Sequence, residues 1–187
     1  MKLFEDLYSV RFLPEAADIR VAGASYFLMR REAYCELTRE LRKTLGRGAE
    51  AILFRAGYER AKEFYPATVE FTRSEEPEEV VDAARFLSAH LGLYRVVSFS
   101  SDIDAWDGSG KGILSKGPRA RLLVERSFEV CNRHPSGQPR CQYIRGFWTG
   151  LVEKMHGEGR RFVGTEVECE GAGARRCRLE FSLVPVF

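Results

Sequence analysis

The sequence predicts an α/β domain of the α+β type, in which helices pack on a largely antiparallel sheet. Apolar residues recur at helical spacing in three segments between residues 32 and 91. After residue 92 the pattern changes to segments rich in β-branched and aromatic residues, which are typical of strands. The chain then closes with one helical segment and two strand-like segments, which a GAGAR turn at 171–175 joins into a hairpin.

Length and composition predict one folded domain. A chain of 187 residues suits a single domain, and 44% hydrophobic and 12% aromatic residues are enough to build a core. We expect a short N-terminal extension at 1–18 and a single ligand-binding domain at 19–187. The net charge of +2, from 29 basic and 27 acidic residues, gives no general affinity for nucleic acid.

The N-terminal sequence and the cysteine count predict a cytoplasmic protein. Glu5 and Asp6 interrupt the apolar core that a secretory signal would need. No run approaches the roughly 18 apolar residues of a membrane span. In a reducing compartment, the five cysteines favour metal binding or catalysis over a disulfide framework, and their odd number argues against complete pairing.

One strand and three helices are predicted for the N-terminal half. Residues 19–30 predict a strand that bends at Gly23, and residues 32–45 predict a helix. A second helix over 49–64 ends at Pro66, and a third begins at Ser74 and stops at Gly92. The residues expected to face inward are Tyr34, Leu37, Leu41 and Leu45 in the first helix, Ile52, Leu53, Ala56 and Ala61 in the second, and Val80, Val81, Ala84 and Leu87 in the third.

The C-terminal half predicts strands, two loops and one further helix. The expected elements, in order, are a strand at 93–100, a loop at 104–118, a strand at 121–130, a loop at 132–140, a helix at 140–156 and hairpin arms at 161–170 and 176–184. Pro139 stands near the start of the helix, where proline is tolerated.

The last helix places a cysteine at its N-terminus on the core side. Its shared face consists of Ile144, Trp148, Leu151, Val152 and Met155. Extending this face by three residues toward the N-terminus reaches Cys141. A helix N-terminus favours the thiolate, which is the form of cysteine that binds metals.

Two more cysteines lie on the hairpin. Cys169 and Cys177 stand on opposite arms of the GAGAR turn, which can bring them side by side. Together with the thiol of Cys141, three sulfurs from two elements can therefore converge, as in a zinc site. The alternative is that these cysteines are small buried apolar residues without a metal.

The spacing Glu-x-x-Cys nominates Glu166 as the fourth ligand, because zinc accepts a carboxylate oxygen as well as sulfur. Residues three apart on a regular strand point to opposite faces, so Glu166 can join Cys169 only where the strand is bulged or turning. Spacing alone leaves four rivals for this position: Glu168, Glu170, Cys131 and His134.

The pattern C-x8-G-x15-E-x2-C-x3-G-x3-C resembles the 4-vinyl-reductase domain family, a hydrocarbon-binding family whose superfamily includes subunits of the TRAPP transport particle. In this sequence its positions are Cys141, Gly150, Glu166, Cys169, Gly173 and Cys177. The segments ILFRAGYERAK and LVERSFEV also resemble the family, so the resemblance covers roughly residues 20–183. One departure is a slightly long segment between Cys141 and Glu166, which contains the stretch MHGEGRR.

The resemblance implies a structural zinc, because the family's ligands are three cysteines and a glutamate and map onto Cys141, Glu166, Cys169 and Cys177. Four protein ligands leave no open position for a substrate, so the metal would clamp the last helix to the hairpin. The resemblance also implies a pocket for a small hydrophobic or aromatic molecule beside the zinc. The candidate ligand-binding residues are His90, Phe99, Phe128, Trp148, Tyr58 and Phe54.

We therefore expect a stand-alone sensor or carrier for a hydrophobic or aromatic ligand, with its output passed to a protein partner. One alternative is an accessory protein or reductase for tetrapyrrole vinyl groups, and another is a dimerising scaffold without ligand. A homodimer is expected, since an apolar helix pair between Tyr34 and Phe64 can supply a symmetric interface. Fingerprints of hydrolases, P-loop enzymes and dinucleotide enzymes are absent from the sequence, which favours binding over catalysis.

Overall fold

The computed structural model describes residues 11–13, 15, 18–21, 24–26, 29–101, 120–131, 137–157 and 159–184. The strands are β1 (Arg11–Leu13), β2 (Asp18–Val21), β3 (Ala24–Tyr26), β4 (Arg95–Ser101), β5 (Ala120–Glu125), β6 (Phe162–Glu168) and β7 (Cys177–Leu183). The helices are α2 (Arg31–Leu45), α3 (Arg47–Thr72), α4 (Pro77–His90), α5 (Gln142–Met155) and the short 3₁₀ helix η3 (Glu170–Ala172). The predicted loop at 104–118 lies outside the described residues.

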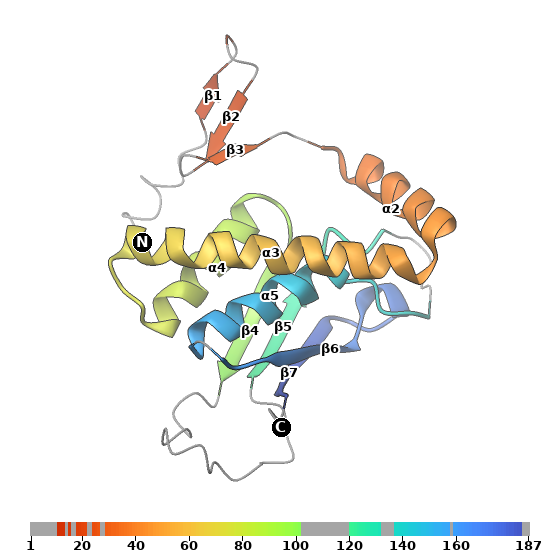
Figure 1. Ribbon diagram of the computed structural model, residues 1–187. Helices are drawn as coiled ribbons and strands as arrows, with labels where there is room; N and C mark the ends of the chain where they lie inside the picture. Colours follow the sequence, from red (N-terminus) through yellow and green to blue (C-terminus); the bar gives the residue numbers. More distant parts are fainter. Residues whose placement is uncertain are drawn as a thin grey trace.

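The main sheet has the order β4-β5-β7-β6, and each neighbouring pair is antiparallel. Helix α5 packs on this sheet and α3 crosses over α5, so the sheet and the two helices form successive layers (Figure 1). Alternate residues of β5 and β7 are buried, which is the pattern of a sheet with one covered face. The predicted α+β class with a largely antiparallel sheet is confirmed.

Helices α3 and α5 approach closely because glycines face each other at their crossing. A Cβ on Gly57 would lie 2.1 Å from the carbonyl oxygen of Tyr143, and a Cβ on Gly146 would lie 1.9 Å from that of Phe54. Gly150 continues the contact one turn later, against Ala61. Because a side chain at these positions would overlap backbone, glycine here sets the distance between the two helices.

The N-terminal strands form a small antiparallel sheet of their own, with the order β1-β2-β3. The single bent strand predicted over 19–30 is wrong: β2 and β3 are separate strands that pair with each other, with Ile19 opposite Tyr26. The chain reverses its direction between Val21 and Ala24, which pair at the end of this hairpin. Strand β1 lies within the predicted extension and pairs with β2, and the boundary at residue 18 stays a prediction.

Helix α2 lies where it was predicted, and Tyr34 and Leu41 of its predicted inward face are half-buried, but the inward positions of Leu37 and Leu45 are wrong. Leu37 and Leu45 are 55% and 46% exposed, whereas the buried residue of this helix is Thr38. The helix meets the rest of the fold along one edge, where the rings of Tyr34 and Phe128 lie 4.8 Å apart. In a single chain, no layer of the described structure covers the leucine face.

Helix α3 extends to Thr72, so the predicted end at Pro66 is wrong. Proline removes one hydrogen bond inside a helix, and here packing on both sides of it compensates, since Phe64 and Thr68 are buried. The predicted inward positions of Ile52 and Ala56 are also wrong, because both residues are exposed, Ile52 by 50%. The buried residues of α3 follow the glycine face instead, at positions 49, 57, 61, 64 and 68.

The third helix and most C-terminal elements agree with prediction, but the strand predicted over 121–130 is too long, because β5 ends at Glu125. The expected core residues of α4, which are Val80, Val81, Ala84 and Leu87, are all buried. Ser74 accepts a hydrogen bond from the backbone N–H of Glu76, which precedes α4, so it stabilises the approach to the helix without being its N-cap residue. In the described part of the chain, no helix combines the length and the apolar character that crossing a membrane demands.

Cys35 and Cys131 form a disulfide that joins α2 to the segment after β5. The expectation that metal binding or catalysis would take precedence over disulfide formation is therefore wrong for this pair, because the fold brings two residues 96 positions apart within bonding distance. The guanidinium of Arg31 strengthens the same junction by donating to the carbonyl oxygens of Ser127 and Val130, at 2.6 and 2.9 Å. The remaining three cysteines are unpaired and buried.

We expect Gly146→Ala to lower the free energy of unfolding by about 3 kcal/mol or more, because the new Cβ would force α3 and α5 apart. Thermal denaturation would show this as a fall in Tm of about 6 to 12 °C. The matched control is Gly48→Ala in α3, where a Cβ would make an ordinary contact at 3.6 Å with Leu45. Equal stability of the two variants would contradict the proposed role of the glycine contact.

Candidate functional site

Cys141, Glu166, Cys169 and Cys177 converge in the C-terminal part of the fold. Cys141 is the N-cap residue of α5, Glu166 lies in β6, Cys169 follows β6, and Cys177 opens β7. One ligand atom from each residue lies within 4.8 Å of the ligand atoms of the other three, and all four side chains are buried. We refer to these four residues as the cysteine–glutamate cluster.

A β-bulge brings Glu166 and Cys169 to the same side. The register of β6 against β7 shifts between Glu166 and Glu168, and Val167 and Glu168 are both exposed. This extra residue changes the alternation of the strand, so that two residues three apart both turn inward. A shared ligand site for Glu166 and Cys169 required a bulge or turn in this strand, and the structure contains the bulge.

Backbone and side-chain groups surround the ligand atoms. The backbone N–H of Cys141 donates to Oε2 of Glu166 at 3.0 Å, and that of Glu170 donates to Sγ of Cys177 at 3.2 Å. Sγ of Cys141 lies 3.3 Å from Oγ of Ser127 and 3.3 Å from Sγ of Cys177. N–H groups aimed at sulfur and carboxylate oxygen stabilise the ionised forms, which are the forms that bind metals.

The protonation chemistry of the cluster fits a bound cation. Burial, with the adjacent thiol of Cys169, raises the pKa of Glu166 to about 8. Hydrogen bonds from Cys141 and Cys177 lower the pKa of Cys169, while hydrogen bonds with Cys169 and Cys177, together with burial, hold the pKa of Cys141 well above its usual range. Without a cation, the cluster must therefore keep protons on several buried groups that would otherwise be negatively charged.

The geometry also fits a metal ion. Oε1 of Glu166 is buried and has no hydrogen-bond partner in the described part of the chain, so it can accept a metal. Two sulfurs that each lie 2.3 Å from a tetrahedral zinc are about 3.8 Å apart, so the 3.3 Å between Cys141 and Cys177 requires only a small outward movement. The buried cluster could thus hold a metal ion.

The rival ligands are engaged elsewhere or lie outside the described residues. Glu168 forms an ion pair with Arg178 at 2.9 Å, and Cys131 is in the disulfide. The carboxylate of Glu170 accepts the backbone N–H groups of Arg126 and Ser127, at 3.0 and 3.3 Å. His134 is the rival that the structure does not describe.

Glu129 is an important buried residue that sequence reasoning did not select. Its carboxylate accepts the backbone N–H groups of Tyr143 and Ile144 at 2.9 and 2.8 Å, so it caps the N-terminus of α5 from another element. Burial raises its pKa to about 7. The sequence feature that could have indicated Glu129 is its place between the apolar residues Phe128 and Val130. Its contact with α5 depends on the tertiary fold.

The predicted ligand-binding aromatics fall into three groups. In the first, the rings of Phe99 and Trp148 stack with centroids 5.3 Å apart, and the indole N–H of Trp148 donates to the hydroxyl of Tyr94 at 3.0 Å. Trp148 and Tyr94 are buried, whereas Phe99 is half-buried. His90 ends α4, which packs against β4, but its side chain lies outside the described part of the structure.

The second and third groups lie at other places. Phe128 contacts Tyr143 with ring centroids 5.9 Å apart, beside the N-terminal turn of α5. Phe54 and Tyr58 stack on each other along α3, with centroids 6.2 Å apart. Among the predicted ligand-binding aromatics, Phe99 and Trp148 therefore lie together. Phe128, Phe54 and Tyr58 contact other residues elsewhere in the fold.

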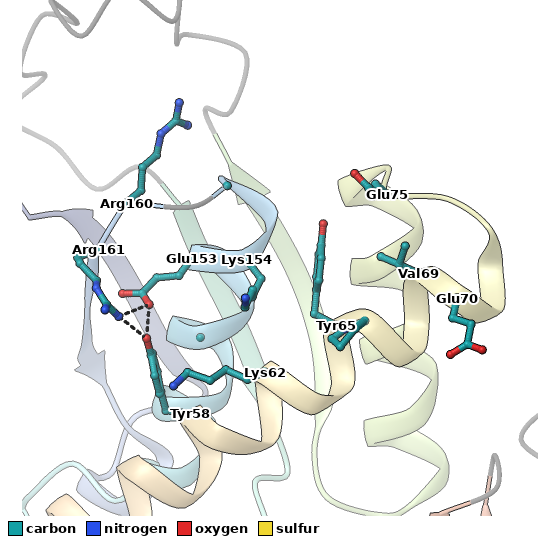
Figure 2. A pocket seen from close by; sticks show the side chains of 14 residues that line it. Tyr58, Lys62, Tyr65, Val69, Glu70, Glu75, Glu153, Lys154, Arg160 and Arg161 are labelled. Carbon is teal, nitrogen blue, oxygen red and sulfur yellow. Dashed lines mark hydrogen bonds and ion pairs between the residues drawn. The ribbon is translucent and has the colours of Figure 1, made fainter.

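Tyr58 lines a polar groove on the surface between α3 and the end of α5. Figure 2 shows its hydroxyl bonded to Glu153 and to Arg161, whose Nη1 lies 2.8 Å away. Lys62 lies over the ring, 4.7 Å from its centroid. With charged residues on several sides, this groove of about 780 Å³ has a polar and charged lining that differs from the apolar pockets typical of aromatic ligands.

Two family models match this chain, over two segments that do not overlap. The model described as "Activator of aromatic catabolism" matches residues 6–104, and the 4-vinyl-reductase domain model matches residues 121–183. No protein among the curated ones matches.

Several solved structures share the fold. The phenol-responsive sensory domain of the transcription activator PoxR with phenol has a TM-score of 0.73 at 20% identity, over 97% of this chain and 89% of that chain. A vinyl-4-reductase family protein from Methanocaldococcus jannaschii has a TM-score of 0.52 at 15% identity, over 86% and 85%. Trafficking protein particle complex subunit 3 from Naegleria fowleri, covalently bound to palmitic acid, has a TM-score of 0.50 at 12% identity, over 83% and 95%.

The TM-scores show a common fold, and the family models add the relationship in sequence. The resemblance inferred from the cysteine and glutamate pattern is confirmed, because the 4-vinyl-reductase domain model covers that pattern. Since the other model spans more than half of the 187 residues, the chain belongs to the family of activators of aromatic catabolism and carries a 4-vinyl-reductase domain in its C-terminal part.

Proposed function

We propose that this chain is a sensory domain that binds a small aromatic molecule beside a structural zinc site. The observation that carries the proposal is the stacked pair of Phe99 and Trp148, in a chain whose family is described as activators of aromatic catabolism. The similarity to a phenol-responsive sensory domain supports the same ligand class. The output passes to a protein partner or to a further part of the protein.

The aromatic pair suits a flat apolar ligand. Phe99 is half-buried, so part of its side chain is accessible to a ligand, while Trp148 is fully buried and donates a hydrogen bond to Tyr94. Ligand pockets are mainly apolar with few polar groups that fix orientation. The hydroxyl of Tyr94 and the imidazole of His90 are our candidates for these polar groups.

We assign zinc to the cysteine–glutamate cluster. Three thiolates and one carboxylate are a tetrahedral donor set that leaves no position for a substrate, so the metal has a structural role. Cys141 and Trp148 lie on the same helix, two turns apart, and the metal would thereby fix the helix that carries the aromatic pair. Zinc binding and ligand binding are coupled through the position of α5.

A homodimer is part of this proposal. The exposed apolar side chains of α2 and the start of α3 include Leu37, Leu45 and Ile52, which are 46 to 55% exposed. A symmetric contact between two copies would remove this apolar surface from water. We also keep the predicted cytoplasmic location as part of the proposal.

Cys177→Ser should remove most of the zinc, which elemental analysis of purified protein would measure as a fall from about one ion per chain. Because structural zinc binding is coupled to folding, Tm should fall by about 10 °C or more. Cys35→Ser is the control for zinc content, since it removes a cysteine that does not belong to the cluster, and it should keep about one ion per chain. Full zinc occupancy in Cys177→Ser would refute the assignment.

Phenol should bind the zinc-loaded protein, and Phe99→Ala should raise the Kd by at least about tenfold, equivalent to about 1.4 kcal/mol. Isothermal titration calorimetry would measure both. Phe54→Ala is the matched control, because this ring stacks on Tyr58 in another part of the structure, and it should change the Kd by less than about twofold.

Two results would count against the aromatic-sensor proposal. One is a similar loss of affinity in the Phe99 and Phe54 variants. The other is a tetrapyrrole retained by protein purified from its own host, observed by native mass spectrometry, because this would favour the accessory or reductase function.

A further inference from the structure

A second groove, with a volume of about 790 Å³, opens beside the cysteine–glutamate cluster. Three arginines from three helices line it: Arg42 from α2, Arg47 from the start of α3, and Arg145 from α5. Glu166 forms part of its wall, so the groove borders the cluster without including the three sulfurs. The site lies apart from the stacked pair of Phe99 and Trp148.

The charges of these arginines are balanced only in part, by the more distant carboxylates Glu129, Glu50 and Glu166. Within the described part of the chain, none of the three forms an ion pair with a carboxylate. Nε of Arg42 and Nε of Arg145 are buried and have no hydrogen-bond partner among the residues that the structure describes. The guanidinium of Arg145 lies over the ring of Phe54, 5.0 Å from its centroid, which holds this charge in place by a cation–π contact.

Positive charge is crowded around the groove. The guanidinium of Arg145 interacts electrostatically with Glu166, Glu50 and Glu129. Glu166 belongs to the cluster, which leaves Glu50 as the other carboxylate on the lining to balance three arginines.

An uncharged group gives an independent indication of a ligand. Gln142 is only 4% exposed and lines the groove, and no described residue donates a hydrogen bond to its Oε1. A buried amide without a partner is costly in a folded protein. The amide can rotate to offer its NH₂ group, so it can donate to an anion together with the arginines.

We propose that this groove binds a phosphate group, either as the free anion or as a phosphate ester. Guanidinium groups that arrive from three helices suit an anion with several oxygens pointing in different directions, and arginine donates two N–H groups at once to such an anion. A carboxylate has only two oxygens, which lie in one plane, so it can accept hydrogen bonds from fewer directions than a phosphate. The bound phosphate joins α2, α3 and α5, and thereby stabilises the docking of α2 on the rest of the fold.

The same arginines could instead balance the charge of the metal-loaded cluster. Three thiolates, one carboxylate and one divalent cation together carry a net negative charge. The structure favours the anion site, because the buried Nε atoms of Arg42 and Arg145 donate to no ligand atom of the cluster. Zinc content in the arginine variants separates these two roles.

The experiment is isothermal titration calorimetry of the zinc-loaded protein at low ionic strength, with inorganic phosphate, AMP and benzoate as probes. We expect saturable binding of phosphate, of AMP or of both, and weaker binding of benzoate. Arg42→Gln should raise the Kd at least about tenfold, because it removes a charged hydrogen-bond donor. Arg42→Lys, which keeps the charge, should recover part of the loss.

The matched control is Arg39→Gln on the same helix, where the arginine is exposed and paired with Glu36. It should change the Kd by less than about twofold. Circular dichroism and elemental analysis should show that Arg42→Gln stays folded and keeps its zinc. A lower Kd for AMP than for phosphate identifies a phosphate ester, and equal values identify the free anion.

Four results would overturn the proposal. The first is that neither phosphate nor AMP binds the wild-type protein. The second is that benzoate binds at least as tightly as both, and the third is that Arg39→Gln weakens binding as much as Arg42→Gln. The fourth is that phosphate binding is lost only in variants that also lose zinc, because the arginines would then serve the metal cluster.

Discussion

Helices α3 and α5 cross at a distance that requires glycine, since a Cβ on Gly146 would lie 1.9 Å from the carbonyl oxygen of Phe54. This contact presses α5 against the main sheet, and Glu129 caps the N-terminus of the same helix. Helix α5 carries residues of every site described above: Cys141 at its N-cap and Trp148 two turns later. A shift of α5 would therefore change the metal cluster, the aromatic pair and the arginine groove together.

Buried polar groups are arranged around this helix in two different ways. Both carboxylate oxygens of Glu129 have hydrogen-bond partners, because each accepts a backbone N–H group. Other buried groups, including Oε1 of Glu166 and the amide oxygen of Gln142, have no partner in the described part of the protein. Since an unpaired buried polar group costs free energy, these two places are consistent with two ligands: a cation at the Glu166 carboxylate and, with the amide rotated so that its NH₂ group donates, an anion at Gln142.

Helix α2 is fastened to the same region by the bond between Cys35 and Cys131 and by the guanidinium of Arg31. Ser127, which receives one of the hydrogen bonds of Arg31, also contacts the thiol of Cys141. The short segment after β5 therefore both attaches α2 and contacts the cysteine–glutamate cluster. This arrangement is a physical route by which events at α2 and at the metal cluster can influence each other.

Local patterns in the sequence determined the fold class, most elements and the convergence of Cys141, Cys169 and Cys177, because helical and strand periodicity and hairpin spacing are short-range properties. Which face of α2 is buried depended on distant neighbours, and so did the β-bulge that turns Glu166 inward. The pairing of Cys35 with Cys131, the cap by Glu129 and the arginine groove join residues far apart in sequence. Only the tertiary structure could decide these, because no local propensity specifies how the helices are placed on the sheet.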